Sequence, residues 1–99
     1  MSGNEDCIMK KRMLFVFNPK AGKGRIKMHL LDIVDIFNKG GYEVILRATQ
    51  GPKDAYEQVK EYADQVDLIA CSGGDGTLAE VVTGIVEVGS QTPIGYIPA

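Results

Sequence analysis

Short apolar runs alternate with segments of helical periodicity, and this alternation restricts the architecture more than any other property of the sequence. Continuous apolar runs closed by turn residues are typical of strands covered on both faces. Apolar residues spaced three and four apart are typical of amphipathic helices. The predicted strands cover residues 13–17, 42–48, 67–72 and 93–99, and the helical patterns cover residues 26–37, 54–63 and 78–86.

A strict strand–helix alternation predicts an α/β fold with a parallel sheet. Because crossovers are right-handed and both faces of the sheet must be covered, the simplest arrangement is a three-layer α/β/α domain with strand order 2-1-3-4. The first helix then lies on one face and the other two helices lie on the opposite face. The carboxyl ends of strands one and three meet where the winding reverses, which is where open parallel sheets bind ligands.

Length, charge and cysteine content exclude several classes of protein. With 99 residues, we expect one small domain, residues 12–99, after a flexible N-terminal segment, residues 1–11. The net charge of −2 argues against a nucleic-acid partner, although seven of the 11 basic residues lie between Lys10 and Lys27 and can attract anions there. The chain has no signal-peptide or membrane-span pattern, and its two cysteines fit no disulfide or metal framework. We therefore expect a cytoplasmic protein whose contact with the inner membrane surface, if it has one, is peripheral.

The loop after the third predicted strand, SGGDGT, has the composition of a phosphate-binding loop. Gly73, Gly74 and Gly76 are predicted to take positive φ and to let a ligand approach the backbone. Thr77 is predicted to cap the following helix, with Glu80 completing a capping box. Backbone N–H groups and the positive end of the helix dipole would then hold phosphate.

Asp75 is the acid of this loop, and beside bound phosphate it would be repelled unless it faces a cation or accepts a proton. Asp75 is therefore a candidate to hold magnesium or to position an acceptor hydroxyl. The alternative is a structural role for Asp75 in an Asx turn.

The loop after the first predicted strand, NPKAGKG, supplies the other candidate residues. Asn18 and Pro19 end the strand, and Lys23 between two glycines offers a point charge for phosphate oxygens. The alternative is an ordinary exposed turn. A Walker A motif is absent, and the formal Rossmann match at Gly74, Gly76 and Ala79 follows the third strand instead of the first.

Taken together, FVFNPKAGKG and SGGDGTLAEVVTG resemble the lipid kinase family that includes diacylglycerol kinases, sphingosine kinases and bacterial relatives of the YegS/DagK type. The resemblance covers residues 13–99 and implies transfer of the γ-phosphoryl group of ATP to a lipid hydroxyl with Mg²⁺. It implies that Asp75 is the catalytic and metal-binding acid. The residues that it implies for nucleotide binding are Asn18, Lys23, Gly24, Gly73, Gly74, Gly76 and Thr77.

The chain departs from the family pattern in two respects. Ala79 and Thr83 stand where the family commonly has asparagine, and the sequence stops at GYIPA, where family members continue into a β-rich second domain with the lipid pocket and general base. We therefore expect the ATP-binding half of such an enzyme, inactive alone and weak in nucleotide binding. The alternatives are a relative of NAD kinases, which share GGDGT, and a nonenzymatic nucleotide-binding module. An exposed last strand would favour a homodimer.

Overall fold

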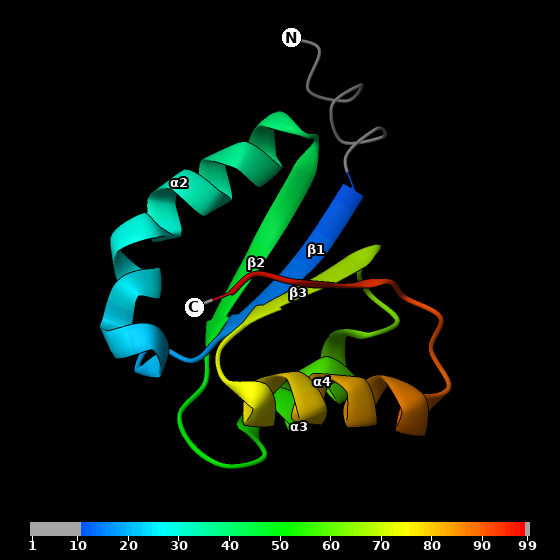
Figure 1. Cartoon of the computed structure of the whole chain (residues 1–99). Helices are drawn as coiled ribbons and strands as arrows, with labels where there is room; N and C mark the ends of the chain where they lie inside the picture. The colour runs from blue at the N-terminus through cyan, green and yellow to red at the C-terminus, as the bar shows by residue number, and fades with distance from the viewer. Residues whose placement is uncertain (1–10, 99) are drawn as a thin grey trace, which may run out of the picture.

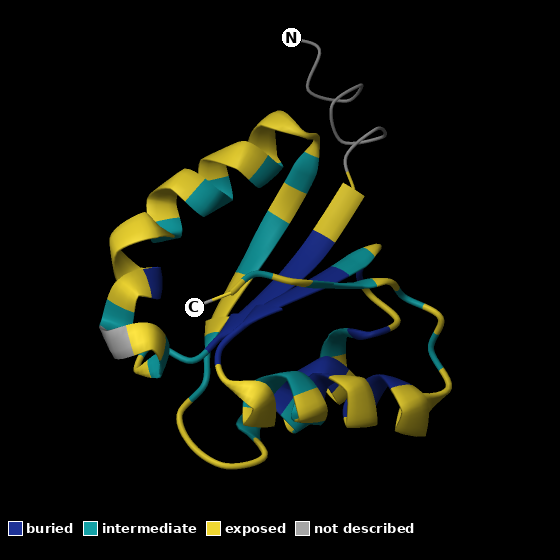
Figure 2. Ribbon diagram, in the orientation of Figure 1, coloured by how far each residue is buried: buried dark blue, intermediate teal, exposed yellow. Residues whose placement is uncertain are grey.

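The central strand β1 (Lys11–Phe17) runs between two layers of helices, and this position explains its continuous apolar run. The computed structural model describes residues 11–98, and for Lys23 it describes only the backbone. Leu14 and Val16 belong to the apolar cluster on one face of the sheet, whereas Phe15 and Phe17 belong to the cluster on the other face. Both clusters are buried, as the dark centre of Figure 2 shows.

The remaining elements follow in the predicted alternation. They are the 3₁₀ turn η1 (Ala21–Gly24), α2 (Arg25–Lys39), β2 (Tyr42–Ala48), α3 (Asp54–Tyr62), β3 (Leu68–Ser72), α4 (Asp75–Val88) and β4 (Ile94–Tyr96). The described strands form one parallel sheet in the order β2-β1-β3-β4. This confirms the predicted α/β class and the strand order 2-1-3-4.

The helices cover the sheet from both sides, as predicted (Figure 1). Ile26, Leu30 and Phe37 of α2 pack on the face that carries Phe15. Residues of α3 and α4 pack together on the opposite face, where Val59 and Val81 are fully buried. Gly84 brings these two helices close, because a Cβ at this position would lie 3.1 Å from the carbonyl oxygen of Tyr56.

Some element boundaries differ from the predicted ones. β1 begins at Lys11, two residues before the predicted strand, and the rest of the expected flexible segment, residues 1–10, lies outside the described residues. β4 contains only Ile94–Tyr96 instead of seven residues. Pro93 and Pro98 flank it, and proline has no N–H to donate to a sheet.

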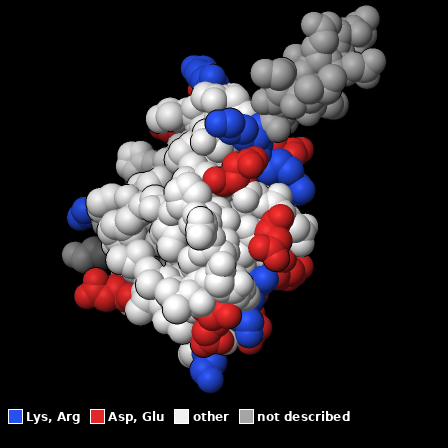
Figure 3. Space-filling view, turned by 90° about the vertical axis from the view of Figure 1, so that its right-hand side faces the viewer, with Lys and Arg blue, Asp and Glu red and all other residues white. Residues whose placement is uncertain are grey.

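The face on the right of Figure 1, beside the C-terminal part of α4, carries few charges in its centre, and the charged side chains lie around it (Figure 3). Val82 and Val86 of α4 and Tyr96 of β4 are exposed apolar or aromatic side chains. The expected homodimer remains a prediction. None of the described helices has both the length and the apolar composition needed to cross a membrane.

Candidate functional site

The two glycine loops lie side by side at the carboxyl edge of the sheet (Figure 1). Phe17, the last residue of β1, is in register with Ser72, the last residue of β3. The N–H of Asn18 donates a hydrogen bond to the carbonyl oxygen of Ser72 at 3.0 Å, so the two loops diverge from a shared point. The predicted proximity of these loops is therefore confirmed.

Gly73 allows the close contact on which this arrangement depends. A Cβ at Gly73 would lie 2.6 Å from Oγ1 and 2.9 Å from Cβ of Thr77, and 3.3 Å from Cβ of Asn18. The carbonyl oxygen of Gly73 also accepts a hydrogen bond from the Tyr96 hydroxyl at 2.8 Å, which ties the loop to β4. Gly73 is thus required by packing.

The glycines with positive φ lie elsewhere, so the prediction for Gly73, Gly74 and Gly76 is wrong. Gly74 has φ −82° and ψ −176°, which is extended backbone open to any residue. In the first loop, Gly22 and Gly24 have φ values of 59° and 79° on either side of Lys23. The left-handed conformation that favours glycine is therefore a feature of the first loop.

The predicted capping box is also wrong, because α4 begins earlier than expected. Gly74 occupies the N-cap position, and its carbonyl oxygen accepts hydrogen bonds from the N–H groups of Thr77 and Leu78 at 3.1 and 3.3 Å. Thr77 therefore lies within the first turn, and no side chain caps the helix. The first N–H groups of a helix have no partner within it, and they attract anions together with the helix dipole. Added Cβ atoms at Gly74 and Gly76 would meet no atom within 4 Å, so a ligand can approach this turn closely.

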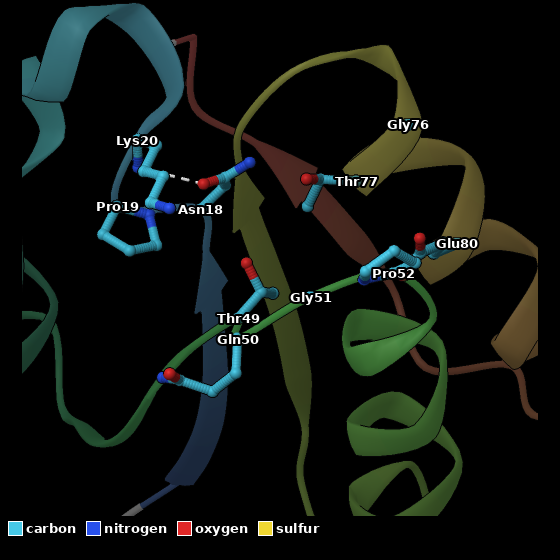
Figure 4. A pocket seen from close by; sticks show the side chains of 10 residues that line it. All are labelled: Asn18, Pro19, Lys20, Thr49, Gln50, Gly51, Pro52, Gly76, Thr77 and Glu80. Atoms are coloured by element: carbon cyan, nitrogen blue, oxygen red, sulfur yellow. Dashed lines mark hydrogen bonds between the residues drawn. The ribbon is translucent and has the colours of Figure 1, made fainter.

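A cavity of about 330 Å³ lies beside this turn, between the first loop, the β2–α3 loop and the start of α4 (Figure 4). Three of the predicted site residues line it: Asn18, Gly76 and Thr77. The sequence interpretation missed the other lining residues, which are Pro19, Lys20, Thr49, Gln50, Gly51, Pro52 and Glu80. Figure 4 shows the side chains of Asn18, Thr49 and Thr77 pointing toward the space between the three segments.

The β2–α3 loop, residues 49–52, forms the wall of the cavity that was not predicted. The N–H of Thr49 donates a hydrogen bond to the carbonyl oxygen of Phe17 at 2.8 Å, and the N–H of Gln50 donates one to Oδ2 of Asp54 at 2.7 Å. The predicted strand order contained the relevant signal. Because β2 is parallel to β1 and adjacent to it, the loop after β2 must start at the same edge of the sheet.

Gly24, Gly73, Gly74 and Asp75, which were also predicted, are not among the described residues that line the cavity. Asp75 is exposed in the first turn of α4, and Gly24 is the last residue of the first loop, where an added Cβ would be 3.9 Å from the carbonyl oxygen of Pro19. The side chain of Lys23 lies outside what the structure describes. Asn18 has a structural role as well, since its Oδ1 accepts a hydrogen bond from the N–H of Lys20 at 2.9 Å.

Cys71, at the end of β3, is a buried titratable group close to the site. Burial raises the pKa of the Cys71 thiol from its ordinary value of 9.0 to about 11, so this residue stays protonated at neutral pH.

Among residues 11–98, no three His, Cys, Asp or Glu side chains are placed to hold a metal ion by themselves. Mg²⁺ is commonly bound by one or two carboxylates together with phosphate oxygens and water. A single exposed carboxylate such as that of Asp75 is compatible with this mode of binding.

Comparisons with known proteins agree with this arrangement. The model of the diacylglycerol kinase catalytic domain matches residues 12–99. Diacylglycerol kinases from Bacillus subtilis and Staphylococcus epidermidis are 38% identical over 89 residues and 40% identical over 91 residues. These segments cover 89% and 91% of this chain but only 29% of each relative.

A solved structure of a diacylglycerol kinase from Bacillus anthracis superposes with a TM-score of 0.80 at 31% identity, and covers 90% of this chain and 30% of its own. The chain thus spans about 30% of the length of the relatives that it matches. Because the family model accounts for nearly all described residues, the chain belongs to the diacylglycerol kinase catalytic domain family.

Proposed function

We propose that this chain is the ATP-binding part of a lipid kinase that transfers the γ-phosphoryl group of ATP to a lipid hydroxyl, with diacylglycerol as the first candidate acceptor. One observation carries the proposal: the uncapped start of α4, with open space over Gly74 and Gly76, faces a cavity closed on its other side by the first loop. Family membership supports a lipid acceptor and favours this function over that of an NAD kinase.

The phosphate groups of ATP would be held mainly by backbone N–H groups in the first turn of α4. Gly74 and Gly76 leave room for phosphate oxygens, and the hydroxyl groups of Thr49 and Thr77 offer further donors. Lys20 lines the cavity and would balance the negative charge, as would Lys23, which precedes Gly24 in the first loop. Phosphoryl transfer depends mainly on such positioning and charge neutralisation.

Asp75 is proposed as the residue that holds Mg²⁺ together with the phosphates. The ion would neutralise negative charge on the phosphate oxygens during transfer. Asp75 is exposed and forms no ion pair with another described side chain, which leaves its carboxylate available for this role. The acceptor lipid and its general base would be handled by parts of the relatives that lie beyond the matched 29–31%.

A titration of the 99-residue chain with ATP, in the presence and absence of Mg²⁺, tests the site. Calorimetry should show weak binding that Mg²⁺ strengthens. Asp75→Asn should remove the gain from Mg²⁺, whereas Asp64→Asn, a control at an exposed acid outside the cavity lining, should retain it. An unchanged Mg²⁺ response in Asp75→Asn would remove Asp75 from the metal site.

A chimera tests the activity. Residues 12–99 would replace the matching segment of the Bacillus subtilis diacylglycerol kinase, and the product should phosphorylate diacylglycerol. Asp75→Ala should abolish this activity, and the Asp64→Asn chimera should keep it. A folded chimera that binds ATP but phosphorylates no lipid would favour a nonenzymatic nucleotide-binding module, and one that phosphorylates NAD would favour a relative of NAD kinases.

A further inference from the structure

Glu80 makes contacts that the capping-box pattern did not anticipate. It lies in the second turn of α4, but its carboxylate reaches the start of α3. Oε2 accepts a hydrogen bond from the N–H of Lys53 at 3.0 Å, and Oε1 accepts one from the N–H of Tyr56 at 3.4 Å. A carboxylate with both oxygens on N–H groups at a helix N-terminus is a cap, here supplied by a different helix.

The start of α3 needs this external cap because its own N-cap residue cannot provide one. That residue is Lys53, whose side chain has no acceptor atom and makes no capping hydrogen bond. Lys53 also has φ 68°, and it is the only non-glycine residue with a positive φ among the described residues. This conformation is strained for lysine and persists only where its surroundings hold it.

Residues 49–52, which immediately precede Lys53, form one wall of the cavity. Their first residue is tied to β1 through Phe17, and Gln50 is tied to Asp54 at the start of α3. Glu80 provides the connection from the end of this segment to α4, the helix that carries the opposite wall. The short distance between the helices at Gly84, one turn after Glu80, makes this reach possible.

From this geometry we propose that Glu80 is a positioning residue of the nucleotide site, which holds the β2–α3 loop at a fixed distance from the first turn of α4. The inference rests on the proposed function, since it assumes that phosphate binds between these two walls. The proposal also explains why an acidic residue, Glu80, lines a cavity that is proposed to bind the negatively charged phosphates. The negative charge of Glu80 is directed onto the N-terminus of α3 and is compensated there.

The matched control is Glu87, which also connects α4 to α3 but lies outside the lining of this cavity. Glu87 accepts a hydrogen bond from the hydroxyl of Tyr56, on the surface of the helix pair. Glu87→Ala thus removes a contact between the same two helices while leaving the cap on α3 in place. A loss of affinity in Glu80→Ala but not in Glu87→Ala would separate positioning of the loop from general stability.

The test combines amide hydrogen exchange and ATP titration of the full 99-residue chain and its Glu80→Ala, Glu80→Gln and Glu87→Ala variants. Glu80→Ala should speed exchange at Lys53 and Tyr56 and weaken ATP binding, each by about tenfold, because both charged hydrogen bonds are lost. Glu80→Gln keeps one carbonyl acceptor and should recover part of both effects, and it serves if the alanine variant fails to fold. Glu87→Ala should bind ATP within about twofold of the unmodified chain.

Three results would overturn the inference. Glu80→Ala with unchanged ATP affinity would show that the cap does not position the loop. Equal losses of affinity in Glu80→Ala and Glu87→Ala would reduce Glu80 to a stabilising residue, and a lost Mg²⁺ response in Glu80→Gln would make it a metal ligand instead. If the unmodified chain binds no ATP, the proposed function fails first, which is a distinct outcome from failure of this inference alone.

Discussion

Gly73→Ala should destabilise the fold, because it adds a methyl group where the two loops touch. The new Cβ would lie 2.6 Å from Oγ1 of Thr77, and rotation of the Thr77 side chain can relieve that contact. Rotation cannot relieve the 2.9 Å contact with Cβ of Thr77, whose position is fixed by the backbone of α4. The loop must therefore move away from the helix or from Asn18.

The magnitude follows from two opposing effects. Overpacking of a tight contact costs about 1–3 kcal/mol. The reduced entropy of the unfolded chain returns about 0.4–1 kcal/mol when glycine becomes alanine at a compatible φ. A net loss of about 1.5 kcal/mol corresponds to a decrease in Tm of about 6–12 °C for a domain of this size.

Thermal unfolding followed by circular dichroism measures this decrease, and Gly74→Ala is the matched control. An added Cβ at Gly74 meets no atom within 4 Å and its φ of −82° suits alanine, so this variant should lose no stability and the entropy effect should raise its Tm by about 2–8 °C. Thr77→Ala added to Gly73→Ala should restore only part of the loss, since the Cβ of residue 77 remains. Equal Tm values for the two glycine variants would refute the packing argument.

Three further predictions concern other parts of the site. Tyr96→Phe removes the hydrogen bond to the carbonyl oxygen of Gly73 and should lower the free energy of unfolding by about 1 kcal/mol in urea titrations; no change would show that β4 does not hold the loop. Lys20→Met should weaken ATP binding several-fold at low salt and less at high salt, because salt screens the lysine charge. Calorimetry at two salt concentrations measures this difference, and an equal loss of affinity at both would contradict the prediction. Because the folded pKa of Cys71 is raised from 9.0 to about 11, its contribution to stability is complete below pH 9 and should be lost as the pH rises from 9 to 11. Urea titrations across this range should show a smaller decrease in Cys71→Ala than in the unmodified chain, because lysine and tyrosine side chains titrate over the same range in both.

The fold was largely predictable because its signals are local and regular. The continuous apolar run of β1 required helices on both faces, and the alternation of elements led to the parallel order β2-β1-β3-β4. The same reasoning placed Asn18 and Gly73 at one edge of the sheet. Right-handed crossovers and two covered faces leave few other arrangements for a chain of this length.

The details of the site were less predictable because they depend on contacts between distant segments. The spacing of Thr77 and Glu80 fits a capping box, yet Glu80 instead caps α3, whose first residue lies 26 positions earlier in the sequence at Asp54. Gly73 is required because a Cβ at this position would be too close to the side chains of Thr77 and Asn18. Composition alone cannot distinguish this packing requirement from a requirement for positive φ. The wall formed by residues 49–52 has no charge or motif that marks it as part of a site.

The central claim is that ATP phosphates bind between the first loop and the start of α4. Backbone amide NMR shifts during titration of the 99-residue chain with Mg²⁺ and ATP test it most directly. The largest shifts are predicted at Asn18 and at residues 49–51 and 74–77. Largest shifts at the separate cavity between α2 and the end of the described chain, which includes Arg25 and His29, would contradict the claim.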